Sequence, residues 1–226
     1  MSASQVRTFV AVPLPAAIRA AIQAVARELS PRFPDLKWTS KPENLHLTLR
    51  FLGQLDEAVM GRFADALAAA LGPRPGFEID LRGLGAFPSP RDARVVWVGV
   101  EDPSRRLADV AGLVGSVADQ FGFGLAARSD NDNGGDHDPG RHDQGRVDGA
   151  RAGHDDGLPA RPFRAHVTIG RTARRAPGLD VTAALAAWSG RALGRVSVRE
   201  VHVYESITGG DASTYVLRGK ATLQPS

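Results

Sequence analysis

One short pattern, histidine–apolar–threonine–apolar, occurs twice in this chain, as HLTL at residues 46–49 and as HVTI at residues 166–169. Both copies lie in apolar runs typical of β-strands, in which residues i and i+2 point to the same face. His46 and Thr48 should therefore project together from one strand, and His166 and Thr168 from another. The apolar residues between them would anchor each strand in the core.

Two such strands that face each other could bring both imidazoles to one substrate. A neutral histidine can take a proton from a nucleophile while a protonated one donates to the leaving group, and a pKa near 6.5 makes both forms available near neutral pH. The threonine hydroxyls could donate hydrogen bonds to phosphoryl oxygens. The pattern thus predicts phosphoester chemistry that needs neither a metal ion nor another cofactor. The alternative, a purely structural role for both histidines, is the weaker interpretation because the pattern is repeated.

The charge of the chain is unevenly distributed. The formal net charge is +3, but residues 128–158 hold 4 arginines and 8 aspartates, a net charge of −4, so the rest of the chain carries +3 − (−4) = +7. A basic body suits an anionic partner such as a phosphate ester or RNA, although a solvated basic surface would look the same. Residues 128–158 are predicted to be a disordered acidic insertion, because they hold too few apolar side chains to form a core. Their histidines and aspartates do not fit the calcium-loop template.

Composition excludes several other classes of protein. The chain has no cysteine, which excludes disulfides, thiolate metal sites and cysteine nucleophiles and is consistent with a reducing setting. No signal peptide is recognisable at the N-terminus. No apolar run approaches the roughly 20 residues of a membrane span. We therefore expect a cytoplasmic protein without a membrane partner.

Outside the insertion, strand and helix patterns alternate. Helices are expected at 15–30, 56–72, 102–122 and 179–190, the first with Ile18, Ile22, Val25 and Leu29 on one face. Strands are expected at 7–14, 44–53, 77–87, 93–100 and 163–171, followed by a strand pair at 194–206 and 214–223. The pattern predicts an α+β fold with mostly antiparallel strands.

Five segments of the chain together resemble the 2H phosphoesterase superfamily. They read RTFVAVPLP, KWTSKPENLHLTLRFLG, GLGAFPSPRDARVVWVGV, RPFRAHVTIGR and VHVYES. They are most similar to the bacterial RNA 2′,3′-cyclic phosphodiesterases, also called 2′-5′ RNA ligases. The resemblance implies two pseudo-symmetric lobes with antiparallel sheets and flanking helices around a central active-site cleft, each lobe giving one motif. It implies a single bilobal domain over residues 1–226, interrupted by the insertion at 128–158.

The resemblance also implies a role for each candidate residue. His46 would donate a proton to the leaving oxygen, His166 would activate water, and Thr48 and Thr168 would bind the phosphate. Arg171 matches an arginine that bacterial members often place after the second motif. Simple alternation would point Arg171 away from His166, unless the strand ends at Gly170.

Arg50 is a second candidate for phosphate contact. It follows the first motif and shares its parity with His46 and Thr48. A surface arginine at a strand end is the simpler interpretation.

The implied function is hydrolysis of RNA 2′,3′-cyclic phosphate ends to 2′-phosphate ends by a monomer. Alternatives within the superfamily are ATP-independent 2′-5′ joining of RNA ends and cleavage of 2′-5′ oligonucleotides or another cyclic phosphate. An alternative of a different class is a non-catalytic RNA-binding module. The acidic insertion departs from the family pattern and bears on how a substrate reaches the site.

Overall fold

The computed structural model describes residues 5–123, 163–173, 175–207, 209 and 213–225. Residues 128–158, the predicted insertion, lie outside this part of the chain, so their disorder and the single-domain division stay predictions. The described elements form an α+β fold with two antiparallel sheets, which confirms the predicted class. The helices are α1 (Ala16–Leu29), α2 (Glu57–Leu71), α3 (Arg106–Gln120) and α4 (Thr182–Ala187), with a 3₁₀ turn at Pro42–Asn44.

Each sheet contains one of the two motif strands. The four-stranded sheet has the order β3 (His46–Asp56), β1 (Gln5–Pro13), β8 (Glu200–Ile207) and β9 (Thr214–Thr222). The five-stranded sheet has the order β2 (Leu36–Trp38), β6 (His166–Thr172), β5 (Asp92–Glu101), β4 (Phe77–Ser89) and β7 (Ala192–Val198). Strands β3 and β6 contact each other, so the two sheets meet where the motifs lie.

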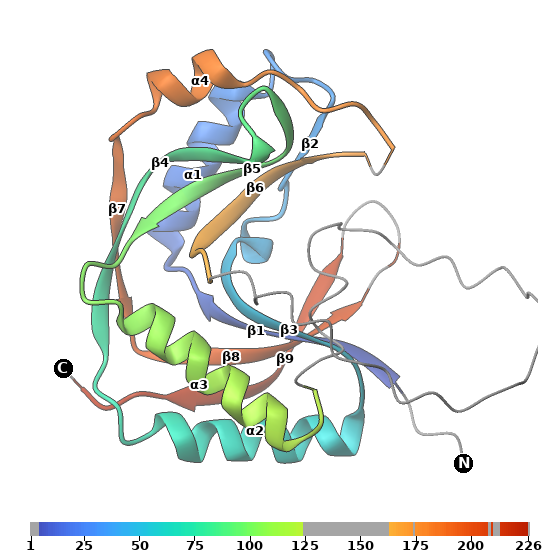
Figure 1. Cartoon of the computed structure of the whole chain (residues 1–226), viewed down its shortest axis with the longest axis vertical. Helices are drawn as coiled ribbons and strands as arrows, with labels where there is room; N and C mark the ends of the chain where they lie inside the picture. Colours follow the sequence, from blue (N-terminus) through green and yellow to red (C-terminus); the bar gives the residue numbers. More distant parts are fainter. Residues whose placement is uncertain (1–4, 124–162, 174, 208, 210–212, 226) are drawn as a thin grey trace, which may run out of the picture.

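The helices cover the outer faces of the sheets. Figure 1 shows α2 below the four-stranded sheet and α4 above the five-stranded one, and α3 packs against α2 and β3. The residues predicted for the apolar face of α1, which are Ile18, Ile22, Val25 and Leu29, are the buried residues of that helix. Because the helices take the outer faces, the inner faces remain for the polar side chains of the motifs. No helix in the described ranges is long and apolar enough to span a membrane.

The same irregularity occurs in both motif strands, one residue after each threonine. In β3, Thr48 pairs with Ala11 but Arg50 pairs with Val10, so Leu49 is an extra residue. In β6, Thr168 pairs with Trp97 and Gly170 with Val96, so Ile169 is the extra residue. A bulge of this kind reverses the alternation of faces beyond it.

The sequence 194–206, predicted as one strand, forms two strands that belong to different sheets. β7 pairs with β4 and β8 pairs with β1 and β9, and the chain changes sheets at Arg199. The buried valines reveal why: Val196 and Val198 have even numbers, whereas Val201 and Val203 have odd numbers. Their two alternations are out of phase, which one straight strand with a single buried face does not allow. The predicted pairing with the last strand is confirmed for β8 and β9.

The third long helix begins later than its sequence pattern predicted. α3 starts at Arg106, and Pro103 lies in the turn before it. Asp102 stabilises the start of the helix, because its Oδ2 accepts a hydrogen bond of 2.7 Å from the backbone N–H of Leu107. Arg105 precedes the helix with a left-handed backbone, φ 57°.

Strands β4 and β5 approach each other closely next to the histidine of the second motif. Trp97 pairs with Gly85 and is buried, and its ring lies 6.0 Å from that of His166. A Cβ atom at position 85 would fall well inside contact distance of the indole carbons. We expect Gly85→Ala to lower the free energy of unfolding by about 1–3 kcal/mol through overpacking, measured by urea denaturation.

The matched control is Gly61→Ala on α2, where an added Cβ meets nothing within 4 Å. This substitution should leave stability unchanged or raise it by up to ~1 kcal/mol, because alanine is the better helix former. Equal stability of Gly85→Ala and the wild type would show that Trp97 can move aside at no cost.

Candidate active site

The two motif histidines are held in the same way. Nδ1 of His46 lies 2.8 Å from the backbone oxygen of Asn44, and Nδ1 of His166 lies 2.8 Å from that of Arg164. A carbonyl oxygen only accepts hydrogen bonds, so Nδ1 must carry the proton in both rings. In the neutral form each Nε2 is then the basic nitrogen, which can take a proton and give it back.

Aromatic rings surround His46. Its ring centroid lies 4.8 Å from that of Phe9 on β1 and 5.2 Å from that of Tyr215 on β9, the latter in an edge-to-face arrangement. Tyr204 on β8 lies slightly farther away, at 6.5 Å. These contacts restrict the ring of His46 to one orientation and remove water from around it.

The surroundings of His166 combine aromatic rings with a cation. Phe87 meets the imidazole edge-to-face at 5.1 Å, and Trp97 lies beside it. The Arg164 guanidinium stacks over both rings, 5.7 Å from the centroid of Phe87 and 5.3 Å from that of Trp97. Arg164 therefore orients His166 through its backbone oxygen and places a positive charge next to it through its side chain.

The two motif histidines lie close enough for the charge of one to influence the pKa of the other. Burial lowers the pKa of His46 to about 4, helped by the positive charge of Arg171 and by His166. Burial also lowers the pKa of His166, with further contributions from the charges of Arg171 and Arg164. Both imidazoles are consequently neutral at pH 7 in the protein without ligand. Arg171 acts on both of them, so all three groups lie on the facing sides of the two sheets.

Arg171 lies in this site for a different reason from the one expected. The sequence analysis allowed Arg171 to face His166 only if the strand ended at Gly170. The strand does not end there, because β6 continues to Thr172. The bulge at Ile169 instead returns Arg171 to the face of His166 and Thr168. Its Nη2 lies 3.5 Å from Oγ1 of Thr168. The second threonine and the arginine thus form one polar edge beside the imidazole.

The equivalent bulge turns Arg50 away from the site. The parity argument placed Arg50 with His46 and Thr48, and this interpretation is wrong because Leu49 is the extra residue of β3. The Arg50 Nη2 lies 3.4 Å from Oδ1 of Asp119, and the guanidinium sits against Gly115 of α3. Arg50 therefore contributes to the packing of α3 on the sheet. Thr48 keeps the predicted position next to His46.

Several residues around the histidines were not predicted from the sequence. Phe9 and Tyr215 reach His46 from strands far away in the chain, so only the cross-strand register reveals them. His202 was overlooked as well, and it is buried with Nε2 2.9 Å from Glu200 Oε1 and Nδ1 2.8 Å from the hydroxyl of Tyr204. The sequence did indicate this cluster, because residues 200, 202 and 204 are polar and alternate along one strand, so their side chains share a face.

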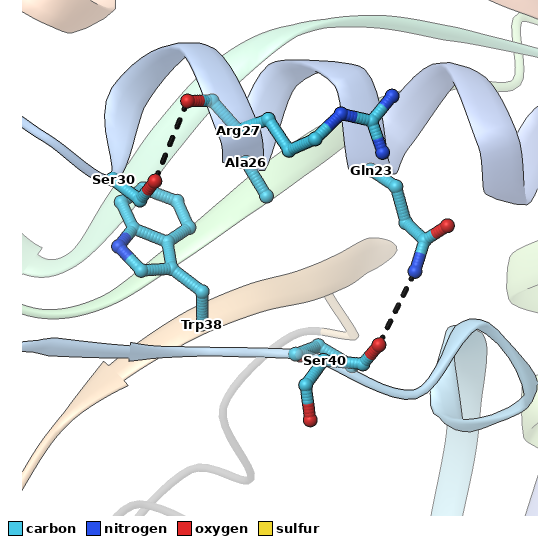
Figure 2. Close-up of a pocket in the computed structure, with 7 residues that line it drawn as sticks. Gln23, Ala26, Arg27, Ser30, Trp38 and Ser40 are labelled. Atoms are coloured by element: carbon cyan, nitrogen blue, oxygen red, sulfur yellow. Dashed lines mark hydrogen bonds between the residues drawn. The ribbon is translucent and has the colours of Figure 1, made fainter.

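A groove with a volume of about 290 Å³ lies between α1 and residues 38–40. Figure 2 shows that its polar groups bond to each other, with Gln23 Nε2 3.3 Å from the Ser40 oxygen and Ser30 Oγ 3.4 Å from the Arg27 oxygen. Trp38 lines this groove and packs against Gly170 on the buried face of β6. The groove therefore lies on the opposite face of β6 from His166. Within the described ranges, no three acidic, histidine or cysteine side chains gather as metal ligands would.

Comparison with known proteins gives consistent results. A family model described as LigT like Phosphoesterase matches residues 12–97. An RNA 2′,3′-cyclic phosphodiesterase of Archaeoglobus fulgidus is 31% identical over 201 residues, which is 89% of this chain and 91% of that protein. A crystal structure of a Thermus thermophilus protein matches with a TM-score of 0.66 at 23% identity, over 96% of this chain and 97% of its own. The crystal structure of Escherichia coli LigT in apo form matches with a TM-score of 0.63 at 25% identity, over 98% and 99%.

The lowered pKa values can be tested by NMR titration of the imidazoles in the protein without ligand. We expect His46 to titrate near pH 4 and His166 below its ordinary value. Arg171→Gln should raise both pKa values, because removing a nearby positive charge favours the protonated imidazole. The matched control is Arg50→Gln, which removes an arginine that faces α3 and should leave both values unchanged. A His46 that titrates at pH 6.5 or above would show that its ring is not desolvated.

Proposed function

The chain belongs to the LigT-like phosphoesterases, as its paired motifs predicted, and from this membership we propose that it hydrolyses 2′,3′-cyclic phosphate ends of RNA to 2′-phosphate ends. One observation carries the proposal: two histidines, each fixed through Nδ1 and each accompanied by a threonine, are coupled to one another and to one arginine. Two proton-transfer groups and an anion-binding edge are what this reaction requires.

In this proposal the phosphate binds along the polar edge that the threonines and the arginine form. Thr48 and Thr168 donate hydrogen bonds to two phosphoryl oxygens. Arg171 neutralises the charge that grows on the phosphate as water attacks, and its planar guanidinium offers several donors for this purpose. The hydrogen bond between Arg171 and Thr168 keeps the two side chains side by side, so that both can donate to the same phosphate.

The histidines transfer the protons. His166 takes a proton from a water molecule through Nε2, and the water oxygen forms a new bond to phosphorus. The bond between phosphorus and O3′ breaks, and His46 gives its Nε2 proton to the departing O3′. The product carries a phosphate on O2′ and a hydroxyl at O3′, and one molecule of water has been consumed.

The donor role of His46 requires that substrate binding raise its pKa. Burial lowers this pKa to about 4 in the protein without ligand, so the imidazole has no Nε2 proton to give at pH 7. His46 must become protonated before it can donate, and a bound phosphate anion favours this because it counters the charge of Arg171. Substrate binding and proton uptake are thus linked, and the site is in its working protonation state only when an anion is present.

The activity test uses an oligonucleotide with a 2′,3′-cyclic phosphate end, incubated in EDTA, with the product end identified. We expect a 2′-phosphate. His46→Ala and His166→Ala should each reduce kcat by about 10²–10⁴-fold, as expected for the loss of a general acid or base, while thermal unfolding shows that the fold persists.

Other products would change the assignment in definite ways. A 3′-phosphate end would contradict the choice of leaving oxygen, and a longer RNA would indicate end joining. Binding of the oligonucleotide without turnover would identify a binding module instead. Activity that survives in either histidine variant would contradict the two-histidine mechanism.

The threonines should affect the rate without changing the product. Thr48→Val and Thr168→Val keep the shape of the side chain but remove the hydroxyl, and each should lower kcat/KM by roughly 10-fold or more, because a hydrogen bond to a charged group contributes about 1.5–3 kcal/mol. Thr48→Ser and Thr168→Ser retain the hydroxyl and should keep most of the activity. Steady-state kinetics on the cyclic-phosphate substrate checks both pairs. Equal rates for the valine and serine variants would remove the hydroxyls from phosphate binding.

A further inference from the structure

Beyond the phosphate edge, a second arginine lies on the inner face of the four-stranded sheet. Arg7 is two residues before Phe9 on β1, so it shares the face from which Phe9 contacts His46. Its neighbour Thr8 pairs with Glu205, and the next residue, Ser206, pairs with Tyr215. Arg7 and Tyr215 therefore lie across the sheet from each other, separated by the width of β8.

Arg7 and Arg171 lie close to the same phenol from different sheets. Burial raises the pKa of Tyr215, while the positive charges of Arg171 and Arg7 both act to lower it. Burial likewise lowers the pKa of Arg171. The positive charge of Arg7 lowers this pKa further, whereas Tyr215 raises it. The hydroxyl of Tyr215 thus stands near two guanidinium groups that repel each other.

No carboxylate relieves this repulsion within the described part of the chain. The ion pairs of that part involve other basic residues, and neither Arg7 nor Arg171 is among them. Two like charges held together without a counter-charge create a strongly positive region, to which an anion is attracted. The first such anion is the cyclic phosphate at Arg171, and Arg7 extends the positive region past it.

We propose that Arg7 and Tyr215, next to Arg171, form a second anion subsite that binds the phosphodiester on the 5′ side of the terminal nucleotide of an RNA. The subsite rests on the proposed function, because it is defined relative to the cyclic phosphate end. Arg7 supplies charge-assisted hydrogen bonds to the diester oxygens and Tyr215 donates its hydroxyl hydrogen. A nucleoside 2′,3′-cyclic monophosphate has no such diester and leaves the subsite empty.

The test compares two substrates in the Arg7→Gln variant. The ratio of kcat/KM for a cyclic-phosphate oligonucleotide to kcat/KM for a nucleoside 2′,3′-cyclic monophosphate should fall by about 10–100-fold, the loss expected for a hydrogen bond between charged groups. The slope of log affinity against log salt for the oligonucleotide should become shallower by about 0.7, the value for one phosphate contact on a single strand. Tyr215→Phe should lower the same ratio by a smaller factor.

Arg62→Gln is the matched control, because Arg62 is an exposed arginine on α2, outside the site. It should leave both the substrate ratio and the salt slope unchanged. An equal loss on both substrates in Arg7→Gln would overturn the subsite and make Arg7 a positioning residue for Tyr215 and Arg171. An unchanged ratio would also overturn it, since no diester would then be in contact with Arg7.

Failure of the proposed function would look different. If the wild type hydrolyses neither substrate, binding of a 2′-phosphate-ended oligonucleotide is compared between the wild type and Arg7→Gln. Weaker binding with a shallower salt slope in the variant supports the subsite although the reaction is wrong. Equal binding rejects the subsite as well.

Discussion

A single extra residue after each threonine determines which side chains reach the active site. A strand alternates its faces with a period of two residues, so without the bulges at Leu49 and Ile169 every later side chain would point the other way. Arg50 would then enter the site and Arg171 would leave it. The bulges reverse this outcome: the sheet of His166 gains a cation beside its threonine, and the sheet of His46 directs its arginine to Asp119. The bulges are therefore part of the catalytic geometry that we propose.

Burial gives the assembled groups their chemical character. Desolvation opposes charge on both imidazoles, and Arg171 makes a positive charge there still less favourable. A site of this kind is positive and poorly hydrated but holds neutral histidines, so it is complementary to an anion that brings its own charge. In the reaction that we propose, electrostatics would select the phosphate, while the threonine hydroxyls and the fixed Nε2 atoms would determine its orientation.

The sequence predicted local features well and non-local ones poorly. The buried face of α1 follows from the spacing of Ile18, Ile22, Val25 and Leu29, because helical periodicity depends only on neighbours in the chain. The paired motifs revealed the family for a similar reason, because each motif is a run of four consecutive residues. The positions of Arg50 and Arg171 depend instead on strand register, which two separate segments determine together. Phe9 and Tyr215 could not be assigned to His46 for the same reason. The break at Arg199 was readable, since the buried valines change parity there.

The two halves of the site share one backbone device but differ in what surrounds it. Both histidines bond through Nδ1 to the carbonyl two residues earlier, and Arg171 acts on both of them. His46 sits among Phe9, Tyr204 and Tyr215. His166 lies beside Phe87, Trp97 and the charge of Arg164. Two identical halves could not distinguish an acid from a base, because equal imidazoles have equal proton affinities. Burial lowers the pKa of His46 to about 4 and also lowers that of His166, to which the charge of Arg164 contributes. In the mechanism that we propose, these unequal surroundings give the two imidazoles different roles: His46 donates the proton to the leaving oxygen, and His166 activates the attacking water.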